Sequence, residues 1–102
     1  MSVIKQYLKK KGTCKITFIL PTAAAEMAKS VNLVGEMNDW DITATPMKKG
    51  RDGSFKVTLE LQSGREYQYR YLINGDVWEN DWEADRYVPS PFTGSENSVV
   101  AI

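Results

Sequence analysis

Apolar and polar residues alternate with a period of two along much of the chain, which indicates half-buried β-strands. The clearest case is FKVTLEL at residues 55–61, where every second side chain is apolar. The same alternation occurs in CKITFIL (14–20), SVNLVGEM (30–37) and EYQYRYLI (66–73), and SVVAI (98–102) would close the chain as a final strand. Within these segments the aromatic side chains that share the apolar face are expected in the core. These are Phe18, Phe55, Tyr69 and Tyr71.

Two glycine-containing turns predict where the chain reverses. Ser63-Gly64 joins residues 55–61 to residues 66–73, and two alternating segments with so short a connection predict a β-hairpin. Asn74-Gly75 signals another tight reversal, into residues 76–78. The turns therefore predict two successive antiparallel pairs in the second half of the chain.

The number and spacing of the segments predict the fold class. Pro89 and Pro91 make residues 87–97 a long irregular connection. Six or seven short strands and almost no helix predict an all-β, immunoglobulin-like antiparallel sandwich of about seven strands. We expect a single domain over residues 13–102, preceded by an N-terminal arm over residues 1–12 in which the lysine run 9–11 is solvated.

The amino-acid composition limits the classes of partner that we expect for this chain. The 102 residues include 13 basic and 13 acidic side chains, so the charge attraction that most nucleic-acid binders use is absent, and no nucleic-acid partner is expected. No run approaches 18 apolar residues, so no membrane partner is expected either. The single cysteine fits a reducing compartment, and residues 1–13 lack the apolar stretch of a secretory signal. We expect a cytoplasmic location.

Catalytic chemistry has few candidate residues here. The chain has no histidine and one cysteine, which excludes histidine-based triads, histidine metal sites and thiolate cages. No catalytic residue, metal or cofactor is therefore expected. The carboxylates of DVWENDWEAD (76–85), with Asp81 and Glu83 as candidates, have the chemistry of a glycosidase pair. An exposed loop offers little to desolvate one carboxyl, so a solvated acidic loop is the favoured interpretation.

The three tryptophans are the most informative side chains. Each sits at a turn or loop flanked by polar groups, in NDW, DVW and NDW, where a single indole is most often a lid over the core. Two or three indoles at one edge of a sandwich would instead form a platform for a neutral sugar, because a pyranose ring presents an apolar C–H face and its hydroxyls need donors and acceptors nearby. Arg70, on the outward face of residues 66–73, and Asn97 have the chemistry to supply those hydrogen bonds.

Three segments in order resemble a known family. They are VNLVGEMNDWDITATPMKK (31–49), DGSFKVTLELQSGREYQYRYLINGDVWENDWEAD (52–85) and GSENSVVAI (94–102). Together they resemble the glycogen-binding carbohydrate-binding modules of the isoamylase N-terminal type, which occur in branching and debranching enzymes and in the beta subunit of AMP-activated protein kinase. The resemblance implies an early-set immunoglobulin-like sandwich that binds alpha-linked glucan.

The resemblance also implies which residues hold the sugar. Trp40 and Trp78 match the two sugar-stacking tryptophans, and Arg70 stands where the glycogen-binding members carry a lysine that bonds sugar hydroxyls. Asn97 matches an asparagine with the same role, and Ser95 lies near a threonine position that lines the site. Relative to the kinase-type pattern, one extra residue separates Gly75 from Trp78, which would rotate the Trp78 indole away from the site; Trp82 is then an alternative platform, or a cap over the core. The expected carbohydrate-binding residues are Trp40, Arg70, Trp78, Asn97, Ser95 and Trp82.

Three functions stay open at this stage. The first is non-catalytic binding of alpha-linked glucan by a stand-alone module. The second is a protein-interaction or scaffold module of the same fold, with a protein partner in glycogen metabolism. The third, a glycoside hydrolase, ranks last, because catalysis in the enzyme members of the family belongs to a separate barrel that these 102 residues do not contain.

Overall fold

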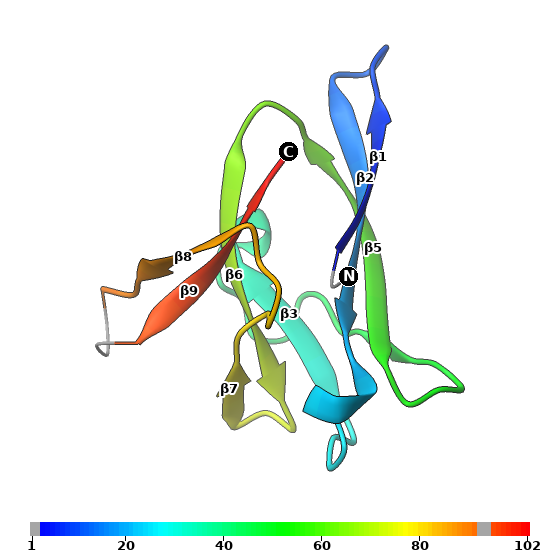
Figure 1. Ribbon diagram of the computed structural model, residues 1–102, viewed down its shortest axis with the longest axis vertical. Helices are drawn as coiled ribbons and strands as arrows, with labels where there is room; N and C mark the ends of the chain where they lie inside the picture. The colour runs from blue at the N-terminus through cyan, green and yellow to red at the C-terminus, as the bar shows by residue number, and fades with distance from the viewer. Residues whose placement is uncertain (1–2, 92–94) are drawn as a thin grey trace.

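The computed structural model describes residues 3–91 and 95–102 of the chain. Within these residues nine strands form two antiparallel sheets, one of four strands and one of five. The sheets face each other, and their inner side chains form one apolar core (Figure 1). The predicted immunoglobulin-like antiparallel sandwich is therefore confirmed, with nine strands in place of about seven.

Sheet A contains the first strands of the chain and has the order β1-β2-β5-β4. Its central pair aligns Ile16 with Leu59 and Phe18 with Val57, so apolar side chains from both strands point to the same inner face. The strands of sheet A are β1 (Val3–Leu8), β2 (Thr13–Leu20), β4 (Lys48–Lys49) and β5 (Phe55–Gln62).

Sheet B is built around one central strand, β6 (Glu66–Ile73), which pairs with three others. The order is β3-β6-β9-β8, and a short strand adds to β6 beyond the end of its pairing with β9. The other strands of sheet B are β3 (Val31–Gly35), β7 (Val77–Glu79), β8 (Arg86–Pro89) and β9 (Glu96–Ala101).

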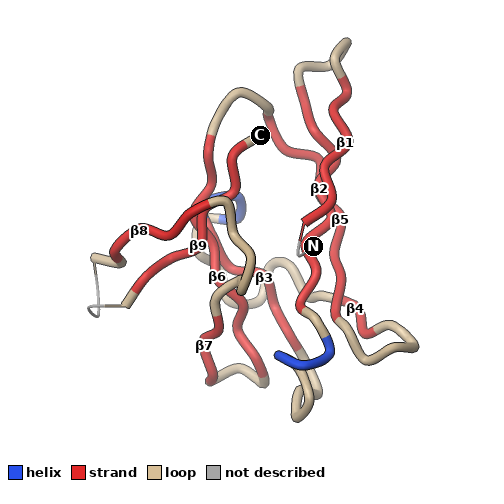
Figure 2. Tube along the Cα trace, viewed as in Figure 1, coloured by secondary structure: helices blue, strands red, loops and turns tan. Residues whose placement is uncertain are grey.

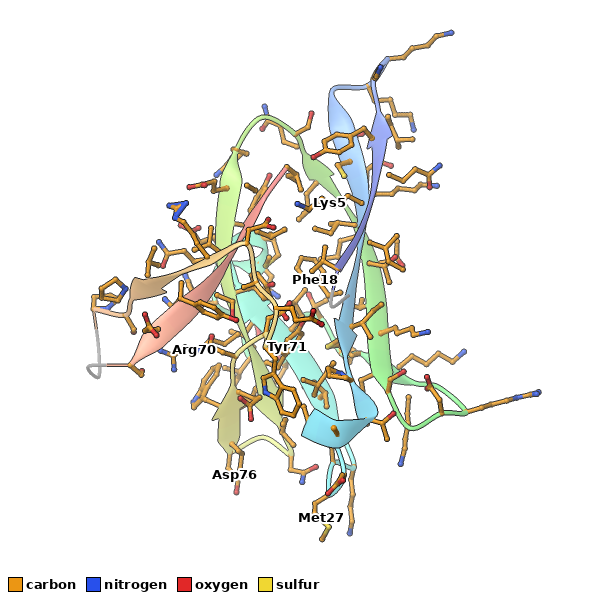
Figure 3. All side chains as sticks on the ribbon, viewed as in Figure 1. Lys5, Phe18, Met27, Arg70, Tyr71 and Asp76 are labelled. Carbon is orange, nitrogen blue, oxygen red and sulfur yellow. The ribbon has the colours of Figure 1, made fainter. Side chains whose placement is uncertain are left out.

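The core lies between the sheets and is rich in aromatic rings. Tyr67, Tyr69 and Tyr71 alternate along β6 and are at most 5% exposed. The rings of Phe18 and Tyr69 meet edge to face across the sandwich, with centroids 5.1 Å apart. Figure 3 shows Phe18 and Tyr71 in the space between the two sheets. The inward positions predicted for Phe18, Phe55, Tyr69 and Tyr71 are confirmed.

The hairpin predicted at Ser63-Gly64 is wrong. The strand before this turn, β5, belongs to sheet A, and the strand after it, β6, belongs to sheet B, so the connection is an arch between the sheets (Figure 1). The backbone N–H groups of Gly64 and Arg65 donate to the carbonyl oxygen of Ile102, at 2.6 and 3.1 Å. A contact with the far end of the chain thus fixes the turn, which a local pattern does not reveal.

The reversal predicted at Asn74-Gly75 is confirmed and joins β6 to β7. Asn74 and Gly75 both have positive φ, 54° and 77°, as the tightest hairpin turns require. The Asn74 side chain also accepts from the N–H groups of Lys29 and Ser30, at 2.7 and 3.2 Å. The turn therefore anchors the loop that enters β3.

Two further predictions about the chain need correction. The arm predicted over residues 1–12 is wrong for Val3–Leu8, which form β1 and pair with β2 along the whole strand, with Val3 packed against the core. The irregular connection over residues 87–97 is interrupted by β8, where Pro89 is tolerated at the end of an edge strand. Residues 92–94 of that connection lie outside the described residues. The lysine run 9–11 is exposed in the turn after β1, as expected.

Lys5 ties the two sheets together. Its side chain leaves β1 towards the interior and donates to Asp85 Oδ2 at 3.0 Å and to the carbonyl oxygen of Ala101 at 2.8 Å (Figure 3). Burial works against the charge on Asp85, but the Ala101 N–H and the Lys5 ammonium outweigh it and hold the pKa of that carboxyl below its usual range. This contact joins the first strand to the last.

Helical structure is limited, in the part of the chain that the structure describes, to two single turns, η1 (Thr22–Ala24) and η2 (Glu36–Asn38). Both are visible as short blue segments in Figure 2. No helix among these residues is long and apolar enough to cross a membrane. The turn η2 matters most, because it follows β3 directly and leads to Trp40.

Candidate ligand-binding groove

A groove of about 610 Å³ lies on the outer face of sheet B. Alternation along β6 places Gln68 and Arg70 on this face, opposite to the buried tyrosines. Val34 is directly opposite Arg70 on β3, and paired residues share a face of the sheet. Figure 3 shows Arg70 on the side of sheet B that points away from sheet A. The groove is therefore separated from the core by the thickness of one sheet.

Trp40 forms one wall of the groove and is placed by an unusual turn. Asp39 and Trp40 both have left-handed backbone angles, φ 57° and 59°, which are uncommon for residues with side chains. The Asn38 amide holds the turn, since its Oδ1 accepts from Gly35 N–H at 3.1 Å and its Nδ2 donates to Leu33 O at 2.8 Å. The Trp40 indole is 40% exposed as a result.

Gly35 is required where β3 enters this turn. Its backbone is fully extended, so no special φ is involved. A Cβ at this position would overlap the carbonyl oxygen of Gln68 and lie 2.8 Å from Tyr69 Cβ. The absence of a side chain lets β3 approach β6 closely at the point where the Trp40 turn begins.

Trp78 lies in the same groove as Trp40. It is carried by β7, where it pairs with Leu72 of β6 and therefore projects from the outer face. Its side chain is 46% exposed, while Leu72 is buried at 3%. The extra residue between Gly75 and Trp78 does not turn this indole away from the groove.

Arg70 lines the same groove as the two tryptophans and is held by two neutral side chains. Its Nε donates to Asn97 Oδ1 at 2.6 Å, and its Nη2 donates to Ser95 Oγ at 2.7 Å. Asn97 is only 4% exposed, and its Nδ2 donates to Gln68 Oε1 at 3.1 Å. The predicted polar residues thus form one connected network, in which Asn97 and Ser95 fix the orientation of the guanidinium.

The sequence pattern did not identify three polar residues of the groove, Glu36, Gln68 and Ser90. The Gln68 N–H donates to Glu36 Oε1 at 2.7 Å. Gln68 was identifiable as an outward neighbour two residues before Arg70, whereas Glu36 becomes its neighbour only through the register of β3 against β6. Apolar and proline residues complete the walls of the groove: Val34, Ile42, Pro89 and Pro91.

Trp82 does not line this groove. It is 54% exposed, in the loop between β7 and β8. The structure therefore brings five of the six expected carbohydrate-binding residues into one region, and places the alternative platform elsewhere.

Asp81 is not a solvated loop residue, contrary to expectation. Its side chain is 2% exposed, with Oδ2 accepting from the Tyr69 hydroxyl at 2.7 Å and Oδ1 accepting from Glu83 N–H at 2.9 Å. Burial, and next the charge on Asp81, raise the pKa of the Tyr71 hydroxyl well above its ordinary value. Asp81 is enclosed by the core and unavailable as a partner of Glu83 in a glycosidase pair. No cluster suited to a metal ion occurs among the described residues.

Comparison with known proteins shows similarity to a domain family and to an enzyme. Residues 22–91 match the family described as carbohydrate-binding module 48, the isoamylase N-terminal domain. A stretch of 71 residues is 38% identical to the 1,4-alpha-glucan branching enzyme GlgB of Aquifex aeolicus (strain VF5). That stretch covers 67% of this chain but 10% of the enzyme, so the chain spans about a tenth of the curated relative that it matches.

Proposed function

The chain belongs to the carbohydrate-binding module 48 family, and on that premise we propose that it binds alpha-linked glucan, such as glycogen, starch or maltodextrin, without catalysing a reaction. The observation that carries the proposal is the groove, which is lined by two exposed indoles and one guanidinium. The enzyme to which this chain is similar is named a 1,4-alpha-glucan branching enzyme, and alpha-glucan is the ligand class proposed here.

The chemistry of the groove suits a neutral sugar chain. The indoles of Trp40 and Trp78 offer flat apolar surfaces on which pyranose C–H faces stack. The guanidinium of Arg70 lines the same groove and is oriented by Asn97 and Ser95, so its remaining N–H groups bind hydroxyls without a large loss of side-chain freedom. In this proposal the two tryptophans and Arg70 touch the sugar directly.

A stand-alone binding role in the cytoplasm completes the proposal. The single cysteine, Cys14, is buried and unpaired, which suits a reducing compartment. The buried position of Asp81 supports binding over hydrolysis, because hydrolysis needs two carboxyls that both reach the sugar. Release of reducing ends from amylopectin by the purified protein would contradict the non-catalytic assignment.

Isothermal titration calorimetry with maltoheptaose tests the proposal. Trp40→Ala should weaken binding about 30-fold, because truncation of a central stacked tryptophan costs about 2 kcal/mol and 1.4 kcal/mol corresponds to tenfold. Trp82→Ala is the matched control, since it removes an exposed indole outside the groove. Absence of heat with the wild-type protein, or equal losses in both variants, would refute the proposed site.

A second candidate function is protein docking at β1, supported by the exposure of that strand. β1 is an edge of sheet A, and its Ile4 and Tyr7 are 53% and 51% exposed. An edge with exposed apolar side chains can accept a further strand from a partner, such as an enzyme of glycogen metabolism. A complex that persists in excess maltoheptaose and is lost in Ile4→Lys would favour this function.

A further inference from the structure

Several hydrogen-bond acceptors of the groove are already occupied by donors from the protein itself. A guanidinium has only N–H donors, so Arg70 cannot accept a hydrogen bond from a sugar hydroxyl. The side-chain oxygens of Asn97 and Ser95 already accept from Arg70, and the oxygen of Gln68 accepts from Asn97. Each free glucose hydroxyl both donates and accepts, so the sugar needs an acceptor that this network does not readily supply.

Glu36 supplies an acceptor at the edge of the network. It is exposed and lines the groove, and its Oε1 accepts from the Gln68 N–H at 2.7 Å. That bond stands where the β3–β6 pairing stops, because the chain leaves β3 after Gly35 to form η2. The carboxylate is therefore held in place through one oxygen, and no described residue bonds the other oxygen in the structure.

Gln68 supplies a donor beside it. Its Oε1 accepts from Asn97 Nδ2, which leaves its own side-chain NH₂ directed away from that bond. No described residue accepts from this NH₂ group in the structure. Glu36 and Gln68 thus supply one acceptor and one donor to the same groove, and each side chain is held by one hydrogen bond from the protein.

We propose that Glu36 and Gln68 form an additional contact point for the glucan, the acceptor–donor pair, which binds two neighbouring free hydroxyls of one sugar unit. The Glu36 carboxylate accepts from one hydroxyl, and the Gln68 NH₂ donates to the other. Hydrogen bonds to an ionised acceptor are the stronger kind, so Glu36 carries most of the effect. This inference rests on the proposed function and adds a requirement to it, namely that the hydroxyls at this point are unsubstituted.

Titration of the Glu36→Gln variant with β-cyclodextrin tests the pair. The new amide keeps an oxygen to accept from the Gln68 N–H, but presents an NH₂ group where the sugar needs an acceptor. We expect about tenfold weaker binding, with an unchanged urea midpoint. Glu26→Gln, an exposed glutamate outside the groove, is the control and should bind as the wild type does.

A methylated ligand separates a direct contact from an indirect one. β-Cyclodextrin methylated at both its 2- and 3-hydroxyls cannot donate from either position, so methylation should weaken binding to the wild type more than to Glu36→Gln. Equal affinity of Glu36→Gln and wild type for β-cyclodextrin would overturn the pair and leave the proposed function standing. A loss of affinity that comes with a lowered urea midpoint would also overturn it. No binding by the wild type would refute the proposed function itself.

Discussion

Substitution of Gly35 by alanine tests whether the Trp40 turn depends on the close approach of β3 to β6. The added Cβ would overlap the Gln68 carbonyl oxygen and lie 2.8 Å from both Tyr69 Cβ and Met37 Sδ. The methionine end can move, but the other two atoms belong to the backbone and the base of a buried ring. Because β6 is the centre of sheet B, the strain falls on β3 and on the turn that follows it.

The expected loss can be estimated from these contacts. Overpacking of a tightly packed site costs about 1–3 kcal/mol, and obstruction by backbone places Gly35→Ala at the upper end, about 3 kcal/mol. Gly64→Ala is the matched control, since Gly64 has φ 81° but a Cβ added there would meet no atom within 4 Å. It should cost about 1 kcal/mol for the left-handed conformation alone.

Urea denaturation followed by tryptophan fluorescence measures both losses. Gly35→Ala should also lose affinity for maltoheptaose, because the same shift displaces Trp40, whereas Gly64→Ala should bind as the wild type does. A Gly35→Ala protein with wild-type stability, or one less affected than Gly64→Ala, would refute the argument from close approach.

Three other measurements test the core, the Lys5 contact and the groove. Tyr69→Phe should lower the free energy of unfolding by about 2 kcal/mol, because buried Asp81 loses a donor. Tyr71→Phe should lower it less, since the Tyr71 hydroxyl has no hydrogen-bond partner of normal geometry among the described residues, and equal losses of the two variants in urea denaturation would contradict this. The pKa of Asp85 is lowered in the folded state, so its ionised carboxyl contributes to stability fully above about pH 4, and this contribution is lost as the pH falls through the lowered pKa. Lys5→Met should make the loss of stability at acid pH smaller, as measured by urea titrations. Binding of a neutral glucan should be unchanged between about 0.05 and 0.5 M NaCl, and a strong salt dependence in calorimetry would indicate an ionic ligand.

Much of the fold was predictable because side-chain alternation is a local property. The period of two in β6 predicted that Tyr69 and Tyr71 face the core while Arg70 faces outward, and the structure confirms it. The pattern does not say which strand lies next to which. Ser63-Gly64 has the composition of a hairpin turn, yet its hydrogen bonds to Ile102 make it an arch between sheets. Only the tertiary structure decides between these two outcomes.

The candidate site was predictable to a similar extent. Exposed tryptophans after polar turns, together with the family resemblance, pointed to Trp40, Arg70 and Trp78, which the structure brings to one groove. Glu36 was missed because nothing in its neighbourhood along the chain marks it, and its position beside Gln68 follows from strand register. Asp81 was misjudged for the same kind of reason, since its burial depends on a hydroxyl twelve residues earlier in the chain.

The placement of core and groove on opposite sides of β6 has a practical consequence for protein engineering. Side chains on the outer face can be varied while the tyrosines that hold the sheets together remain untouched. Sites built on strands are also more precise than sites on loops. A combinatorial library at positions 68 and 70, with the Gly35–Trp40 turn kept constant, would therefore retain a high proportion of folded members. Such a library could be selected for sugars that the natural groove rejects.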